Sequence, residues 1–284
     1  MPTRREFLKR SITAGAVAAA GLAGFSLYEP HQLKITRLEL SLRRLPPAWD
    51  GVRVAQVSDL HFRPFTTAGE IEAAVRAVNS LQPDLIALTG DFVTIPMFGD
   101  SVAAARNMEV CAPLLAALRA PLGVVAVLGN HDVGTDPIFI AGALHDRGIE
   151  VLRNRALPLE RGGARVWIAG LDDAENNLLD IPRALAPVRD EAAVILMVHE
   201  PDVADQAARY AVDLQLSGHS HGGQIAVPLL GPPYLPPLAR KYWRGLYRVR
   251  DLQVYTNRGI GTVGVPMRFQ APPEITLFTL RSPR

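Results

Sequence analysis

Short runs of consecutive apolar residues recur along the chain, and each is followed within three residues by an aspartate, asparagine or histidine. The clearest of these runs are 85–88, 124–128, 166–169 and 193–198. A strand covered on both faces is apolar throughout, so the runs predict buried strands. Segments with helical periodicity separate several of them, at 70–81, 101–118 and 139–147. We therefore expect an α/β protein whose polar residues gather at the carboxyl ends of its strands.

The remaining strands are expected at 33–42, 52–57 and 212–216, and a helix is expected to begin at Pro201. Beyond His221 the helical periodicity stops, and the runs 224–227, 245–249, 252–257 and 274–280 predict short antiparallel strands. A Gly-rich loop lies at 259–264. A Pro-rich loop, 228–237, either packs on the sheet or flanks an acyl or membrane-facing entrance.

The composition fits a single globular domain over residues 31–284. Of the 284 residues, 48% are hydrophobic and 20% are charged, which supports a large core. The net charge of +2 gives no reason to expect a nucleic-acid partner. Cys111 is the only cysteine, so an internal disulfide and a thiolate metal cluster are excluded. We expect Cys111 to be a small buried apolar residue.

Residues 1–30 have the order of a secretory signal. Thr3-Arg4-Arg5-Glu6-Phe7-Leu8-Lys9 is a twin-arginine pattern, and the uncharged stretch 11–28 follows it. This order resembles the signal of the bacterial twin-arginine route, which implies contact with that export machinery. The protein would then be periplasmic or associated with the outer face of the inner membrane. A retained N-terminal anchor or a surface helix is the alternative, and cleavage near residues 21–23 is left open.

Polar side chains that follow the strands form a candidate metal site. The candidates are Asp59, His61, Asp91, Asn130, His199, His219 and His221. Carboxylate, imidazole and amide ligands together suit two divalent ions from the group Mn, Fe, Zn, Co and Ni. One shared carboxylate can hold two cations about 3.5–4 Å apart, and such a pair acidifies a bridging water for attack on phosphorus. The pattern therefore predicts a dinuclear centre for phosphoryl transfer.

The order of these motifs resembles that of the calcineurin-like metallophosphoesterases over 52–221. The motifs are Asp-x-His, Gly-Asp, Gly-Asn-His-Asp, a lone His and Gly-His-x-His. Later segments resemble an exported or membrane-associated bacterial branch, which includes phosphodiesterases and enzymes similar to UDP-2,3-diacylglucosamine pyrophosphatase. These segments are Lys241-Tyr242-Trp243-Arg244-Gly245-Leu246-Tyr247, Asn257-Arg258-Gly259-Ile260-Gly261 and Pro272-Pro273-Glu274-Ile275-Thr276.

The resemblance implies a four-layer sandwich of two mixed β-sheets flanked by helices. It also implies two ligand sets that share Asp91, one with Asp59, His61 and His221 and the other with Asn130, His199 and His219. His131 would stabilise charge on the phosphate and protonate the leaving oxygen, and Asp132 would orient His131 through a hydrogen bond. The family has an acid shortly after Gly-Asp, whereas Phe92-Val93-Thr94 follows here.

These features predict a metal-dependent hydrolase of a phosphodiester or pyrophosphate. A lipid or a nucleotide-sugar lipid such as UDP-2,3-diacylglucosamine is one substrate class. A phosphomonoesterase or protein phosphatase and a non-catalytic metal-binding envelope protein are the alternatives. Arg258, beside the Gly-rich loop, is a candidate phosphate-binding residue, and Arg240, Lys241 and Arg244 are weaker ones.

Overall fold

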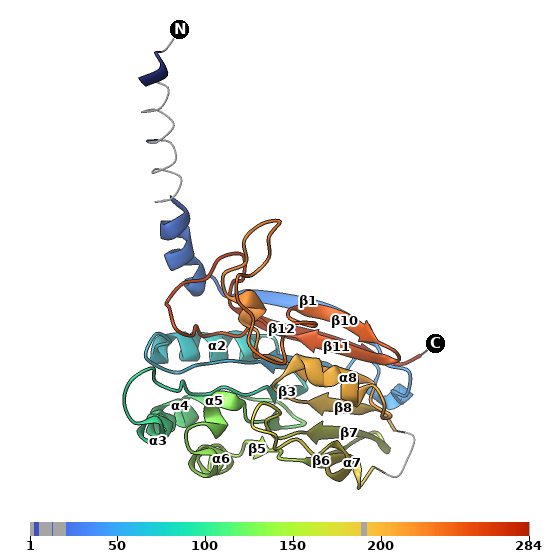
Figure 1. The fold of residues 1–284 in the computed structure, drawn as a ribbon. Coiled ribbons are helices and arrows are strands. Elements are labelled where there is room, and N and C mark those ends of the chain that lie inside the picture. The colour runs from blue at the N-terminus through green and yellow to red at the C-terminus, as the bar shows by residue number, and fades with distance from the viewer. Residues whose placement is uncertain (1–2, 6–12, 14–20, 189–191, 284) are drawn as a thin grey trace.

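The computed structural model describes residues 3–5, 13, 21–188 and 192–283, and these form two mixed six-stranded sheets (Figure 1). The first sheet has the order β1 (Lys34–Ser41), β12 (Glu274–Arg281), β2 (Arg53–Val57), β3 (Leu85–Leu88), β4 (Val124–Ala126) and β5 (Glu150–Val151). The second has the order β10 (Gly245–Val249), β11 (Leu252–Thr256), β9 (Leu214–Ser217), β8 (Val194–Met197), β7 (Ala164–Gly170) and β6 (Arg155–Arg161).

Parallel pairing dominates the centre of both sheets. Strands β2 to β5 are parallel neighbours in the first sheet, as are β7, β8, β9 and β11 in the second. Strand β12 is antiparallel to β2 and parallel to β1, so the two ends of the domain share one ladder. Parallel strands end at the same edge of a sheet, and this arrangement brings the loops after β2, β3 and β4 together.

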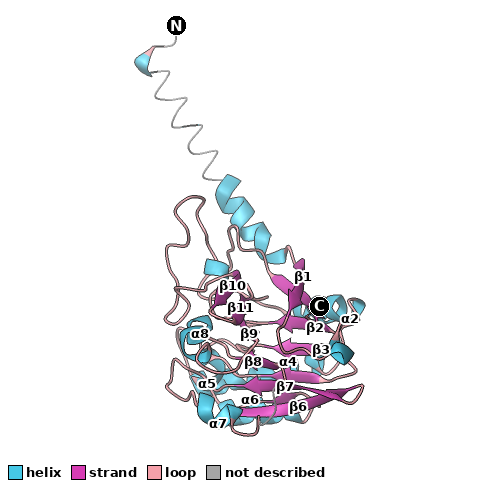
Figure 2. Cartoon of the chain, turned by 90° about the vertical axis from the view of Figure 1, so that its right-hand side faces the viewer, coloured by secondary structure: helices cyan, strands magenta, loops and turns pink. Residues whose placement is uncertain are grey.

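Helices cover the outer faces of the sheets. They are α2 (Ala68–Ser80), α3 (Ser101–Ala104), α4 (Met108–Leu115), α5 (Asn130–Val133), α6 (Pro137–His145), α7 (Ile181–Leu185) and α8 (Ala204–Ala207). Short 3-10 turns lie at Glu29–His31, Pro47–Trp49, Ala105–Asn107, Pro201–Val203 and His221–Gly223. Residues 21–28 form a further helix, the N-terminal helix, which leads toward β1 (Figure 2).

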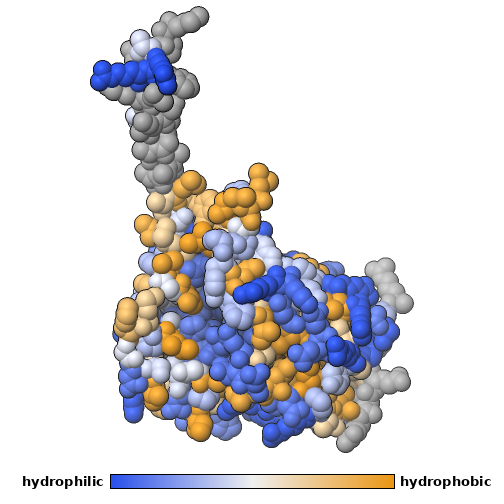
Figure 3. All heavy atoms as spheres, viewed as in Figure 1, coloured by the Kyte–Doolittle hydropathy of each residue, from blue (hydrophilic) through white to orange (hydrophobic). Residues whose placement is uncertain are grey.

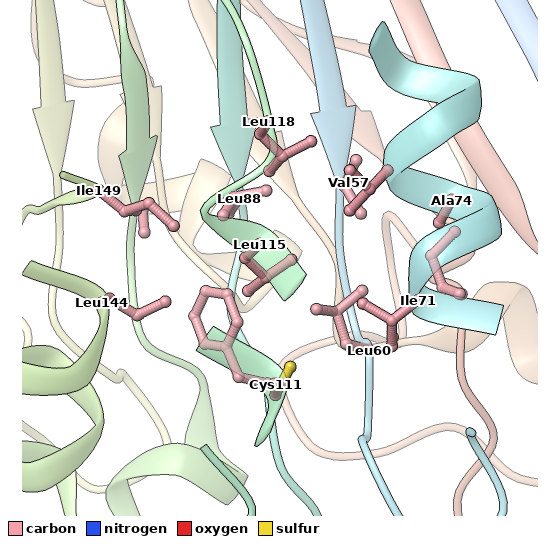
Figure 4. Packing of buried hydrophobic residues seen from close by; sticks show 14 of the residues in the cluster. Val57, Leu60, Ile71, Ala74, Leu88, Cys111, Leu115, Leu118, Leu144 and Ile149 are labelled. Carbon is pink, nitrogen blue, oxygen red and sulfur yellow. The ribbon is translucent and has the colours of Figure 1, made fainter. Parts of the chain in front are cut away.

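Three apolar clusters occupy the interfaces between four layers. One lies between α2, α4 and α6 and the first sheet, a second between the two sheets, and a third between the second sheet and α7 and α8. Figure 4 shows the first cluster, in which Ile71 and Ala74 of α2 face Val57 of β2, with Cys111 of α4 nearby. The expected four-layer sandwich of mixed sheets is confirmed, and Cys111 is buried as expected.

The C-terminal part differs from the expectation in two ways. Residues 224–227 form no strand and contribute only isolated bridges, Ile225 to Phe269 and Val227 to Gly231. The expected antiparallel character is also only partial, because β11 pairs in parallel with β9 and β12 with β1. Polar Gln224 explains the first difference, since its side chain bonds the backbone of 263–265 rather than extending a ladder.

The twin-arginine pattern and much of the stretch 11–28 lie outside the described residues. Within the described part of the chain, no helix combines the length and the apolar character needed to span a bilayer.

Candidate metal centre

The loops after five strands bring the predicted ligands to one place. Asp59 and His61 follow β2, Asp91 follows β3 and Asn130 follows β4, all in the first sheet. His199 follows β8, and His219 and His221 follow β9, in the second sheet. The site therefore lies where the carboxyl ends of the parallel strands of both sheets converge.

One group of side chains consists of Asp59, His61 and His221, all buried. The Nε2 atoms of His61 and His221 are 3.1 Å apart, and His221 Nε2 lies 3.4 Å from Asp59 Oδ1. These distances place three ligand atoms around one point, as a single cation requires.

A second buried group consists of Asp91, His199 and His219. Asp91 Oδ2 lies 3.0 Å from His199 Nε2 and 3.3 Å from His61 Nε2, so this one oxygen stands between the two groups. Burial raises the pKa of Asp91, but the charge of His199 and the other histidine contacts beside it together outweigh burial and hold that pKa well below its usual range. Asp91 therefore has the position and the charge state expected of a shared carboxylate.

Two candidate metal-binding atoms of the site lack a hydrogen-bond partner. Asn130 Oδ1 and His199 Nε2 are both buried in this state. Such groups are costly inside a protein unless something binds them. An oxygen and an imidazole nitrogen facing a carboxylate suit a divalent cation, and the residues present therefore fit the metal that the motifs imply.

Three of the candidate ligand histidines have one ring nitrogen in contact with a neighbouring polar group. His199 Nδ1 donates to the carbonyl of Thr89 at 2.7 Å, and His219 Nε2 donates to the carbonyl of Pro237 at 2.9 Å. His61 Nδ1 lies 3.2 Å from the hydroxyl of Thr94. Each contact fixes the ring and leaves its other nitrogen for a metal. Thr94 therefore supports the site from the segment after Gly90-Asp91, where the family has an acid that this chain lacks.

The backbone of the ligands is strained. The left-handed region is occupied by Asp59 (φ 50°), His61 (φ 43°), Asp91 (φ 56°), His219 (φ 69°) and His221 (φ 51°). Non-glycine residues seldom adopt this conformation, and where they do they cluster at functional sites. Glycines allow the loops to approach: a Cβ on Gly129 would lie 2.3 Å from Asp91 Oδ1, and one on Gly218 would lie 2.2 Å from Asp59 Oδ2.

His131 lies next to His61 and Asp91, and a nitrogen of its ring is within 4.8 Å of ligand atoms of both. Its ring packs edge-on against that of His61, with centroids 4.7 Å apart. The backbone N–H of Ile95 donates to His131 Nδ1 at 2.8 Å, which leaves the proton of the neutral ring on Nε2. Burial lowers the pKa of His131 to about 4 against the opposing charge of Asp91, so the ring is neutral at pH 7.

Asp132 does not orient His131, so this prediction is wrong. Both carboxylate oxygens accept backbone N–H groups instead, from Asp91 (2.8 Å), Phe92 (2.8 Å), Val93 (3.3 Å) and Gly129 (3.0 Å). Asp132 therefore ties the loop after β3 to the loop after β4. Burial and nearby Asp91 raise its pKa to about 7, and the N–H groups of Gly129 and Val93 oppose the rise.

Arg258, the candidate phosphate-binding residue, contacts Glu274 in this structure. Its Nε lies 3.2 Å from Glu274 Oε2, and the residue is not among those that line the cleft at the site. The buried guanidinium of Arg268, which the sequence did not single out, holds the Gly-rich loop in position. It donates to carbonyls of that loop at Gly259 and Gly261 and to the carbonyl of Ala271.

A cleft of about 310 Å³ opens over the metal-ligand candidates. Asp91, Asn130, His131, His219 and His221 form its polar part. Ile225, Pro233, Tyr234, Pro236, Pro237 and Val263 form an apolar wall. The sequence did not indicate Glu175, which also lines the cleft, with Oε2 buried, unpartnered and 3.9 Å from His219 Nε2.

Known proteins are similar to this chain over most of its length. It is 37% identical to a protein named "Uncharacterized metallophosphoesterase YkuE" from Bacillus subtilis (strain 168), over 99% of this chain and 98% of the relative. It is 30% identical to "Phosphodiesterase YaeI" from Escherichia coli (strain K12), over 99% and 100% of the two chains. It is 27% identical to "UDP-2,3-diacylglucosamine pyrophosphatase LpxG" from Chlamydia trachomatis, over 88% and 89%.

The model of one protein family, "Calcineurin-like phosphoesterase", matches residues 52–223, which contain every predicted metal ligand. The match agrees with the two-sheet fold and with the clustered carboxylates and imidazoles. The chain therefore belongs to the calcineurin-like phosphoesterase family and is a metal-dependent phosphoester hydrolase.

Proposed function

We propose that the protein hydrolyses a phosphodiester or pyrophosphate bond with two divalent cations bound side by side. The observation that carries this proposal is the place of Asp91 Oδ2, within 3.3 Å of an imidazole nitrogen from each ligand group. A carboxylate in that position can serve two cations at once. Asp59, His61 and His221 would complete one set, and Asn130, His199 and His219 the other.

The roles of the residues follow from their contacts. The cations, when bound, would supply Lewis acidity and a nucleophile at neutral pH. His131 lines the cleft, and the N–H of Ile95 occupies its Nδ1, so its Nε2–H can donate a hydrogen bond to the phosphate and to the charge that develops on the leaving oxygen. Asp132 accepts the backbone N–H groups of Asp91 and Gly129, which fixes the loop of Asp91 relative to the loop of His131.

A substrate with one negative charge at the reacting phosphate suits the cleft better than a dianionic monoester. The unpartnered carboxylate of Glu175 adds negative charge to the cleft wall beside His219. Like charges at this range repel measurably in a partly buried site. This supports a diester or pyrophosphate over a phosphomonoesterase or protein phosphatase activity. A pure metal-binding role is disfavoured because metal binding alone needs no hydrogen-bond donor such as His131 in the cleft.

The apolar wall of the cleft supports a lipid-linked substrate, since acyl or prenyl carbons would bury against Ile225 and Tyr234. The relatives named as a phosphodiesterase and as a UDP-2,3-diacylglucosamine pyrophosphatase are consistent with this class. The twin-arginine pattern supports export, so we place the enzyme in the periplasm or on the outer face of the inner membrane.

The proposal is tested by assaying protein reconstituted with Mn, Fe, Co, Ni or Zn. We expect turnover of a chromogenic phosphodiester, loss of that turnover on chelation, and recovery on adding metal back. Turnover of a chromogenic monoester under the same conditions should be slower. Metal-loaded protein that turns over neither ester, or that prefers the monoester, would contradict the proposal.

A further inference from the structure

We propose that the protein docks on a lipid bilayer through an apolar rim at the mouth of the metal cleft. The apolar rim consists of Leu22, Phe25, Leu229, Leu230 and Tyr234, all exposed. This inference rests on the proposed function, because docking on a bilayer would serve to present lipid phosphoesters to the cleft. Its test does not depend on catalysis.

The tip of the Pro-rich loop exposes leucines to an unusual degree. Leu229 is 107% exposed and Leu230 is 85% exposed. Leu229 also has φ 67°, a backbone conformation that is costly for leucine. The turn is nevertheless well defined, because Val227 and Gly231 exchange backbone hydrogen bonds across it at 2.9 and 2.8 Å. A folded turn that holds leucines in water points to an apolar partner outside the chain.

The loop and the N-terminal helix are fastened to one another through Phe269. The ring of Phe25 packs edge-on against that of Phe269, with centroids 5.9 Å apart. The carbonyl of Phe269 accepts the N–H of Ala226, at the base of the loop, at 2.8 Å. Figures 1 and 2 show the helix and the loop projecting from the same end of the molecule, and Figure 3 shows hydrophobic residues gathered on both.

The apolar rim continues into the cleft. Tyr234 is 70% exposed yet also lines the cleft, together with Pro233 and with His131 and Asp91 of the site. A lipid whose chains remain in the bilayer beside Leu229 could therefore reach the site with its phosphate along an unbroken apolar surface. This continuity distinguishes the apolar rim from exposed apolar residues elsewhere, such as Ile138 on α6.

Two further features favour a bilayer over a protein partner. The uncharged sequence 11–28 includes the N-terminal helix, so the chain enters the body at the apolar rim. Arg244 is exposed beside this surface, where its guanidinium donates to the carbonyl of Gln270, next to Phe269. Apolar side chains flanked by an arginine match the acyl region and the phosphates of a membrane interface.

The buried single cysteine makes a direct test possible. Leu230→Cys would be labelled with a polarity-sensitive fluorophore in the full-length protein, because Cys111 is buried and unreactive. Ile138→Cys, at a residue 80% exposed, is the matched control. Both are mixed with vesicles of phosphatidylcholine and phosphatidylglycerol. We expect a blue shift, and quenching by lipid-borne quenchers, at position 230 and neither at position 138.

Leu229→Asn provides a second variant, because asparagine tolerates the positive φ while removing the apolar side chain. We expect its partition onto vesicles to fall about tenfold relative to Ile138→Ser. A water-like signal at position 230 with vesicles present, or unchanged partition of Leu229→Asn, would overturn the proposal. Turnover of a soluble chromogenic diester by every variant separates this failure from failure of the proposed catalytic function.

Discussion

His131 and Asp132 are adjacent in the chain, but their side chains do different work. His131 points to the cleft with its Nδ1 occupied by Ile95 N–H, whereas Asp132 is buried among backbone donors. Sequence motifs give the residue types at such positions, but they do not say which atoms meet. This is why the clustering of the predicted ligands could be foreseen and the partner of His131 could not.

Replacing His131 should separate catalysis from metal binding. In His131→Ala we expect turnover of a phosphodiester to fall about 100-fold to 1,000-fold, because a hydrogen-bond donor to the developing charge is lost. Metal content, measured by elemental analysis, should not change. His145→Ala, at an exposed histidine of α6, is the control and should match the parent in both measurements. Loss of metal from His131→Ala would show that the imidazole is a ligand after all.

Asp132→Asn should act mainly on stability. The amide group would turn N–H donors toward the backbone N–H groups of Asp91 and Gly129 or of Phe92 and Val93. Leaving two buried donors unpaired costs about 2–4 kcal/mol of the free energy of unfolding. Urea denaturation measures this loss. An unchanged midpoint together with an altered pH–rate profile would restore the orienting role that the sequence suggested.

Gly218 tests how tightly the loops must approach. In Gly218→Ala the new Cβ would lie 2.0 Å from Ser58 Oγ and 2.2 Å from Asp59 Oδ2, so Asp59 must move. A displacement of this size should lower turnover about 100-fold and reduce metal content. Gly142→Ala, on α6 with nothing within 4 Å of the added Cβ, should change neither. Equal activity in the two variants would refute the steric argument.

At the scale of elements, the reactivity of Cys111 reports how tightly helix α4 is packed. Cys111 lies on its buried face in the cluster with α2 and β2, and burial raises the pKa of its thiol. The folded protein should therefore not react with a thiol reagent at pH 8, whereas the protein unfolded in urea should react with one equivalent. Rapid labelling without denaturant would mean that α4 opens readily.

The same thiol gives stability a pH dependence of known sign. The pKa of the thiol is higher in the folded protein than in the unfolded protein. Its contribution to the free energy of unfolding is therefore complete below about pH 8.5 and is lost as the pH rises above that value. Cys111→Ala should lose less stability than the parent between pH 8 and 10, as measured by urea denaturation at each pH. Parallel curves for the two proteins would contradict the assignment.

Elements with strong local patterns were predictable, and those defined by distant partners were not. The run 85–88 matches β3 residue for residue, because consecutive apolar residues between turn signals have few alternatives. Strand β6 was missed, since it is an exposed edge strand with Pro158 inside it. Thr94 could not be found either, because its partner His61 is 33 residues away in the chain. Arg268 was missed because its partner Gly261, 7 residues away, lies in a loop without a periodic pattern.

At the scale of the whole molecule, β12 holds the first sheet together. It lies between β1 and β2, and its first residue, Glu274, also accepts the hydroxyl of Tyr255 and pairs with Arg258. Deleting 274–284 should therefore abolish cooperative unfolding, as followed by circular dichroism. Deleting only 283–284, which follow β12, should have little effect. A cooperative transition in the longer deletion would show that the sheet closes without β12.

The position of β12 has a consequence for biosynthesis. Strands β1 and β2 are synthesised long before the strand that lies between them, so the first sheet cannot be completed until residues 274–281 have left the ribosome. Until then the backbone edges of β1 and β2 that β12 covers are unpaired, so the first sheet forms by a late pairing of distant segments rather than progressively from the N-terminus.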